Sequence, residues 1–135
     1  MAFDPASLRF DEKGLIPAIA QDENDGAVLM MAWMNAEAVA KTLETGQVTY
    51  WSRSRQEFWI KGATSGDTLE LIEARVNCEQ NSILYLVRPK GEGACHTKEP
   101  GGQSRISCYY RIIDEGELKH APYRPTWQGH DSAQG

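Results

Sequence analysis

Three cysteines, Cys78, Cys95 and Cys108, are the residues of this 135-residue chain whose type best suits a bound metal. Thiolates are good zinc ligands, and three protein ligands with one water form the usual catalytic zinc site. The glycine-rich segment 90–107 can fold one cysteine back toward a distant strand. The cysteine spacings match no familiar zinc finger, so the alternative is three small buried hydrophobic side chains.

His96 directly follows one of these cysteines in the sequence. An imidazole can accept and donate a proton or bind a metal, so His96 suits either proton transfer or metal ligation. We expect His96 to be the catalytic residue of a site built around the cysteines.

A second set of side chains has the types that bind a phosphorylated nucleotide. Arginine forks and hydroxyls bind phosphate, a glycine-flanked Thr-Ser pair can form an anion nest, and aromatic rings stack on a purine. In an extended strand over residues 50–55, alternate side chains would share a face. The alternative is a solvated edge strand with a tight turn. The candidate substrate-binding residues are Trp51, Ser52, Arg53, Arg55, Lys61, Thr64 and Ser65.

A third candidate site surrounds the first cysteine. Asn77, Glu79 and Asn81 would project to one side if this stretch were extended, and would offer one carboxylate and two amide oxygens. Oxygen donors of this kind form a weak site for a hard cation such as magnesium. The alternative is a polar turn between two strands.

The elements that must position these residues are mostly strands. Residues 16–21 and 27–34 flank an Asp-Gly pair, which predicts a hairpin, and residues 47–54 and 58–61 predict a second one. One clear helix follows Asn35 as N-cap and ends at Gly46. Further strands are expected at residues 68–76, 83–87 and 109–113. One helix among about six strands predicts a single-domain, mainly antiparallel α+β fold. We expect an N-terminal segment 1–13, a domain 14–113 and a C-terminal tail 114–135.

The composition limits the class of protein. A net charge of −5 argues against a nucleic-acid binder, which usually carries a basic excess. The chain shows no secretory signal, and its longest apolar run, residues 27–34, is too short to span a membrane. We expect a cytoplasmic protein with reduced cysteines.

Several motifs occur together and in order along most of the chain. They include Tyr-Trp-Ser-Arg-Ser-Arg at residues 50–55, Ala-Cys-His-Thr at 94–97 and Ser-Cys-Tyr-Tyr-Arg at 107–111, with further matches at residues 14–22, 28–35 and 61–66. With these motifs the chain resembles the phosphoribosyl-AMP cyclohydrolase family of histidine biosynthesis. The resemblance covers residues 14–111, nearly the whole expected domain.

The resemblance implies a homodimer that opens the adenine ring of 1-(5-phosphoribosyl)-AMP at the N1–C6 bond by means of a zinc-activated water. It implies that Cys78, Cys95 and Cys108 hold the zinc. It also implies a magnesium site on three aspartates, at positions that here read Asn77, Glu79 and Asn81. This departure, and a longer loop between the second and third cysteines, leave room for a changed substrate.

Two other classes of function remain as alternatives. One is a zinc hydrolase or deaminase acting on another purine nucleotide, although the His-x-Glu and Pro-Cys-x-x-Cys signature of base deaminases is absent. The other is an RNA-binding module with structural zinc, which should have cysteines in close pairs and a positive net charge. The chain has neither feature.

Overall fold

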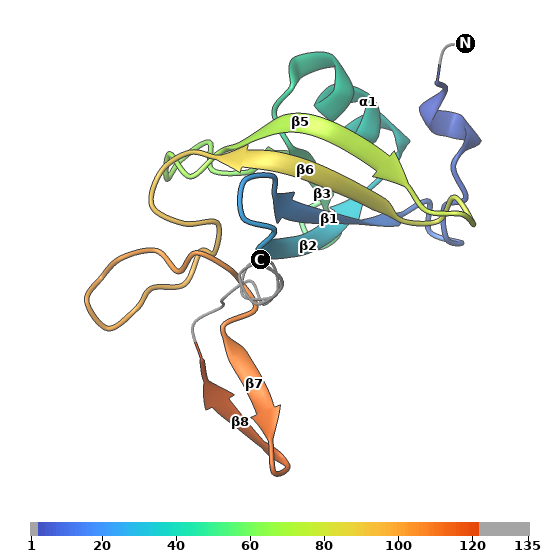
Figure 1. Cartoon of the computed structure of the whole chain (residues 1–135). Coiled ribbons are helices and arrows are strands. Elements are labelled where there is room, and N and C mark those ends of the chain that lie inside the picture. Colours follow the sequence, from blue (N-terminus) through green and yellow to red (C-terminus); the bar gives the residue numbers. More distant parts are fainter. Residues whose placement is uncertain (1–2, 122–135) are drawn as a thin grey trace, which may run out of the picture.

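A twisted four-stranded sheet forms the centre of the molecule (Figure 1). The computed structural model describes residues 3–121. The strand order is β2-β1-β6-β5, with β1 at Ile16–Asp22, β2 at Val28–Met34, β5 at Leu69–Val76 and β6 at Ile83–Pro89. The β1–β2 and β5–β6 pairs are antiparallel hairpins, whereas β1 and β6 run parallel and join the two halves.

The sequence alternation explains which face of this sheet is buried. In β1 the buried side chains are Ile16, Ala18 and Ala20, at every second position. The register of β1 against β6 places Ala20 opposite Tyr85, so a small side chain lies beside the largest buried one on the neighbouring strand. Apolar residues of one face thus form the core, as the period-2 pattern requires.

The single α-helix of the described residues, α1 at Ala36–Thr45, begins and ends where the sequence predicts. The Asn35 side chain accepts a hydrogen bond from the Ala38 N–H at 2.9 Å, and Gly46 ends the helix in the left-handed conformation. Its buried side chains Ala38 and Val39 join the core cluster of the sheet. The helix therefore covers one face of the sheet.

Two shorter hairpins complete the fold. Strands β3 at Thr49–Ser52 and β4 at Glu57–Ile60 pair antiparallel, and the buried ring of Tyr50 joins them to the core. Strands β7 at Arg111–Asp114 and β8 at Glu117–His120 form an arm that projects from the body in Figure 1, and all its residues are exposed. A short 3-10 helix, η1, lies at Pro5–Ser7 near the N-terminus.

The predicted α+β fold with mainly antiparallel strands is confirmed for residues 3–121. Strand β8 lies inside the segment that the sequence assigns to the tail, because its polar residues carry no apolar periodicity. The rest of that predicted tail lies outside the described residues. No helix within residues 3–121 is long and apolar enough to cross a membrane.

Candidate active site

The thiols of Cys95 and Cys108 lie close enough for each to shift the pKa of the other. The loop between them folds back on itself through backbone hydrogen bonds from Ala94 to Ile106 and from Cys95 to Arg105. Cys108 is anchored to the sheet because its N–H donates to the Leu29 carbonyl at 2.8 Å. The long predicted loop therefore brings two of the three candidate zinc ligands together.

The two thiols differ in acidity. Burial favours the neutral form of Cys95, but hydrogen bonds from the Thr97 hydroxyl and N–H, contact with Cys108 and the charge of Arg105 outweigh it, so its pKa lies below the usual value. Burial and the neighbouring Cys95 raise the pKa of Cys108 to about 12. The lowered pKa favours the thiolate form of Cys95. Thiolates bind zinc, so the two cysteines can supply two of the ligands of a zinc site.

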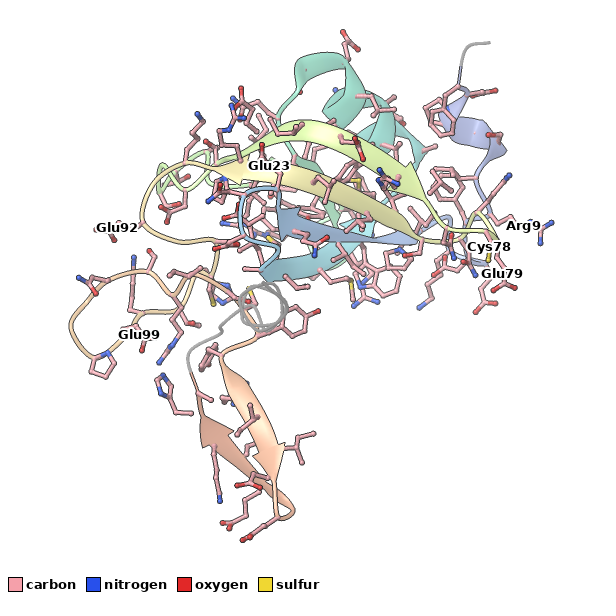
Figure 2. All side chains as sticks on the ribbon, in the orientation of Figure 1. Arg9, Glu23, Cys78, Glu79, Glu92 and Glu99 are labelled. Carbon is pink, nitrogen blue, oxygen red and sulfur yellow. The ribbon has the colours of Figure 1, made fainter. Side chains whose placement is uncertain are left out.

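Cys78 lies elsewhere, exposed in the turn between β5 and β6. Figure 2 shows Cys78 beside Glu79 and Arg9 at one end of the molecule. Glu92 and Glu99, which belong to the loop of residues 90–107 (the cysteine loop), lie at the other end. Within residues 3–121 of one chain, no group of three histidine, cysteine or acidic side chains is arranged to hold a metal. One chain therefore places two of the three predicted zinc ligands together.

A pocket of about 750 Å³ brings five of the predicted site residues together. They come from the turn after β3, the end of β4 and the cysteine loop, and they are Arg55, Lys61, Thr64, Ser65 and His96. The rings of Phe58 and Trp59 also line it, and none of its lining residues is acidic. In a chain with a net charge of −5, this pocket is suited to an anion with an aromatic ring.

Lys61 connects this pocket with the thiol pair. Its side chain is buried, with 7% of the residue exposed, and its ammonium donates to the Asp67 carbonyl at 3.4 Å. Burial lowers the pKa of Lys61, and nearby Asp67, Cys108 and Cys95 oppose this shift. Lys61 therefore lines the pocket and lies near enough to the thiols for their charges to affect its pKa.

The other predicted substrate-binding residues lie outside that pocket. Strand β3 ends at Ser52, and residues 53–56 turn with Gln56 at a positive φ of 54°, so the strand alternation predicted for residues 53–55 is wrong. The guanidinium of Arg53 lies 5.0 Å from the centre of the Trp33 ring. The Ser52 hydroxyl accepts from the Arg55 N–H at 3.2 Å, which fixes the turn.

Trp51 is half-buried and packs edge-to-face on Phe58, with ring centres 4.9 Å apart. Phe58 in turn lines the pocket, as does Lys41 of helix α1, whose ammonium lies 5.0 Å from the Phe58 ring centre. The sequence did not single out Lys41 because its helix lies in no phosphate-binding motif. Its position on a helix adjoining β3 became evident only from the fold.

The stretch around Cys78 forms a turn and is not extended. The Asn77 side-chain oxygen accepts from the N–H groups of Asn81 and Ser82, both at 2.9 Å, and its amide donates to the Asn81 oxygen at 2.6 Å. Gln80 takes a positive φ of 61°. The premise that Asn77, Glu79 and Asn81 project to one side is therefore wrong, and the alternative of a polar turn is confirmed.

The fold and site define a small α+β domain with two neighbouring thiols and a pocket whose lining has basic but no acidic side chains. A family model described as phosphoribosyl-AMP cyclohydrolase matches residues 30–110. The chain belongs to the phosphoribosyl-AMP cyclohydrolase family.

Curated relatives named phosphoribosyl-AMP cyclohydrolase are similar over nearly their whole length. The protein of Cereibacter sphaeroides strain KD131 is 62% identical over 117 residues, which is 87% of this chain and 92% of the relative. That of Dinoroseobacter shibae is 61% identical over 86% of this chain and 92% of its own. The Ruegeria pomeroyi protein is 57% identical over 87% and 92%.

Proposed function

We propose that this chain hydrolyses the N1–C6 bond of the adenine ring of 1-(5-phosphoribosyl)-AMP in histidine biosynthesis, as a cytoplasmic homodimer. The observation that carries the proposal is the pocket that gathers Arg55, Lys61 and His96 and has no acidic residue in its lining. Glu57, outside the lining, pairs with Arg55 at 3.7 Å, and a bound phosphate would compete with it. Family membership and relatives that bear the name of this activity support it.

The substrate has two phosphate groups and one purine, and the pocket offers donors for each. Arg55 and Lys61, with the hydroxyls of Thr64 and Ser65, bind phosphate, and Phe58 offers an aromatic face to the base. Arg53, on the same turn as Arg55 but outside the pocket lining, is the candidate for the second phosphate. Binding these remote groups orients the ring before the reaction.

His96 lies on the wall of the same pocket and is exposed to it. N1-ribosylation makes the C6 atom of the purine electrophilic, so a water can add there. His96 takes one proton of the attacking water as the O–C6 bond forms. When the tetrahedral carbon collapses to the carboxamide, the electron pair of the N1–C6 bond goes to N1, which receives that proton back from His96, and the second proton of the water passes to the exocyclic nitrogen.

Zinc is the metal that the thiol pair fits. We propose that Cys95 and Cys108 of one chain hold it together with Cys78 of a second copy, since Cys78 is exposed in the turn between β5 and β6 and no three such ligands cluster within residues 3–121 of one chain. Zinc held there would make a water more acidic and so a better nucleophile, less strongly than with neutral ligands because thiolates donate charge, and His96 would supply the base.

The turn around Cys78 does not fit a preformed magnesium site. Its two asparagine oxygens already accept hydrogen bonds within the turn, which leaves the Glu79 carboxylate as the charged donor. We therefore assign magnesium no step in the reaction and propose that it binds weakly at Asn77, Glu79 and Asn81, with help from substrate phosphates.

The decisive test is an ultraviolet assay of purine ring opening with purified protein and 1-(5-phosphoribosyl)-AMP. We expect turnover that is lost in the double variant Arg55→Gln with Lys61→Gln. Release of ammonia from a purine nucleotide without ring opening would instead indicate a deaminase and contradict the proposal.

A further inference from the structure

A chain of polar contacts leads from Cys95 away from the pocket and into the cysteine loop. The Cys95 sulfur lies 2.8 Å from the Thr97 hydroxyl oxygen and 3.5 Å from the Thr97 backbone nitrogen, which donates to it. The same hydroxyl oxygen accepts a hydrogen bond from the Arg105 guanidinium at 3.2 Å. Cys95, Thr97 and Arg105 thus form one continuous series.

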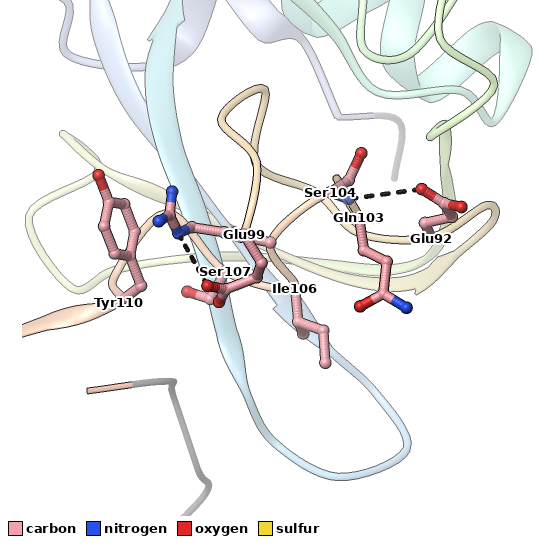
Figure 3. A pocket seen from close by; sticks show the side chains of 8 residues that line it. Glu92, Glu99, Gln103, Ser104, Ile106, Ser107 and Tyr110 are labelled. Carbon is pink, nitrogen blue, oxygen red and sulfur yellow. Dashed lines mark hydrogen bonds and ion pairs between the residues drawn. The ribbon is translucent and has the colours of Figure 1, made fainter. Parts of the chain in front are cut away.

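The Arg105 guanidinium is held from two further sides. It lies over the Tyr110 ring at 4.0 Å from its centre, and its Nε lies 3.6 Å from the Glu99 carboxylate. Figure 3 shows Tyr110 and Glu99 at the pocket of about 390 Å³ which these residues line. The Arg105 side chain is only 14% exposed, so the surrounding residues hold it in one orientation.

We propose that Thr97 and Arg105 are positioning residues for the metal ligand Cys95. The Thr97 hydroxyl donates its hydrogen to the Cys95 sulfur, and Arg105 fixes the hydroxyl in the orientation that makes this possible. This inference rests on the proposed zinc site.

The direction of these hydrogen bonds follows from chemistry. A metal-bound cysteine is a thiolate and can only accept, so the Thr97 hydroxyl must donate to it. A guanidinium has only donors, so Arg105 must donate to the Thr97 oxygen. Each bond strengthens the other, because a hydroxyl that accepts from a cation is a better donor.

A purely structural role explains these side chains less well. The loop is already closed by backbone hydrogen bonds, from Cys95 to the Arg105 carbonyl at 3.0 Å and from Arg105 to the Thr97 carbonyl at 3.2 Å. These bonds do not depend on either side chain. The Thr97 hydroxyl instead contacts the Cys95 sulfur, and Arg105 acts on the sulfur through that hydroxyl. Three thiolates around a divalent zinc leave a net negative charge, which such donors stabilise.

The test uses the purified full-length protein and two matched sets of variants. Thr97→Val removes the hydroxyl at nearly constant volume, and Thr97→Ser keeps it. Arg105→Gln removes the charge, and Arg105→Lys keeps it without the planar fork. The controls are Thr68→Val, outside the series, and Arg88→Gln, whose side chain pairs with Glu23 and Glu70 on the surface.

Two readouts are independent of turnover, namely zinc affinity by competition with a chromophoric chelator and the thiolate-to-metal charge-transfer bands of the cobalt-substituted protein. Loss of an outer hydrogen-bond partner typically weakens metal affinity 10- to 100-fold, so we expect about 10-fold or more for Thr97→Val and Arg105→Gln. The cobalt bands should shift in these two variants. Thr97→Ser and both controls should stay close to wild type.

Wild-type zinc affinity and unchanged cobalt bands in Thr97→Val would overturn the inference, as would equal losses in Thr97→Ser and Thr97→Val. Cys95→Ser separates this from failure of the proposed function. If Cys95→Ser loses zinc while Thr97→Val keeps it, only the positioning role is wrong. If Cys95→Ser keeps wild-type zinc, the proposed zinc site itself is wrong, and the positioning role falls with it.

Discussion

The carboxylate of Asp67 accepts a hydrogen bond from the backbone N–H of Glu92 at 2.8 Å, which ties the turn after β4 to the start of the cysteine loop. The Ser104 hydroxyl, from the far side of that loop, donates to the same carboxylate at 3.2 Å. Gly91 lies where any side chain would overlap the Asp67 carboxylate. Asp67 therefore fixes the position of the turn after β4, which carries Lys61, relative to the cysteine loop.

Asp67→Asn should lower the free energy of unfolding by about 1.5–3 kcal/mol at neutral pH, the usual range for hydrogen bonds to a charged group. Burial raises the pKa of this carboxyl, but the hydrogen bonds from Glu92, Ser104 and Gly93 outweigh it and lower the pKa below 3.8. The ionised Asp67 carboxylate therefore stabilises the folded protein fully when the pH lies above the pKa of Asp67 in the unfolded chain. This stabilisation is lost as the pH falls through the pKa of Asp67 in the folded protein.

Urea unfolding of both proteins from pH 7 to pH 3 measures this difference. We expect the gap between wild type and Asp67→Asn to be largest at neutral pH and to shrink on acidification. A gap that stayed constant with pH would show that the charge of Asp67 contributes nothing.

Gly62→Ala should be far more destabilising than Gly46→Ala, although both glycines have a positive φ, 80° and 76° respectively. An added methyl at Gly62 would overlap the backbone of Asp67, whereas nothing lies within 4 Å of one at Gly46. The backbone strain alone should cost about 1–2 kcal/mol in both variants. Overpacking should add about 1–3 kcal/mol at Gly62 only.

Thermal unfolding of the two glycine variants gives the comparison directly. Gly62→Ala should also raise KM, because Lys61 and the Thr64–Ser65 turn move with it. Equal melting temperatures for the two variants would contradict the close packing of Gly62 on Asp67.

The local elements of this fold could be predicted where the sequence carries a strong local signal. Asn35 and Gly46 define the ends of α1, and the Asp-Gly pair before β2 predicts the first hairpin, because caps and turns depend on residues close in sequence. The parallel pairing of β1 with β6 could not be predicted, since it joins strands about 65 residues apart through tertiary packing.

The candidate site was likewise predictable in its residue types but not in the geometry that depends on the fold. Arg55, Lys61 and His96 were predicted from their types and lie in one pocket, although the strand geometry assumed for residues 53–55 was wrong. A left-handed residue, Gln56, turns the chain there, and such a conformation of a non-glycine residue is not evident from sequence. Thr97 and Arg105 were given no role, because only the folded loop brings them to Cys95.

Replacing any one cysteine with serine should remove zinc and activity together, as measured by metal analysis and the ring-opening assay. Wild-type zinc content in all three serine variants would contradict the proposed ligand set. The placement of Cys78 away from the pair makes a sharper experiment possible.

A mixture of Cys78→Ser and Cys95→Ser chains should recover about a quarter of wild-type activity, because half of the dimers are hybrid and each hybrid has one intact site. A mixture of Cys95→Ser with Cys108→Ser is the matched control and should recover none, since both changes fall in the same half of the site. Recovery in both mixtures, or a monomer by light scattering at assay concentration, would refute a shared site.

His96→Ala should lower turnover about 100-fold or more if His96 transfers a proton in the reaction. His120→Ala is the control, because His120 lies on β8 and contacts Glu99 rather than the pocket. The measurement is kcat of the zinc-loaded enzymes. Turnover within a few-fold of wild type would reject the catalytic role, and weaker zinc binding with normal turnover would show that His96 only supports a ligand.

Magnesium should bind the free wild-type protein weakly, because the turn around Cys78 uses its amide oxygens for its own hydrogen bonds. Asn77→Asp with Asn81→Asp should change this. The carboxylate at position 77 can still accept from the Asn81 and Ser82 N–H groups, but it loses the amide that donates to position 81 at 2.6 Å. Two carboxylates so close repel each other, and a divalent cation relieves that repulsion.

Calorimetry with magnesium chloride in the absence of substrate measures the difference. We expect the double variant to bind magnesium at least about 10-fold more tightly than wild type, since carboxylate charge sets much of the affinity for hard cations. Glu79→Gln in the double-variant background is the control, and it should weaken binding again because it removes the third charge. Tight magnesium binding by wild type, unchanged by the two aspartates, would mean that these residues are not the magnesium ligands and that the turn serves only to connect β5 and β6.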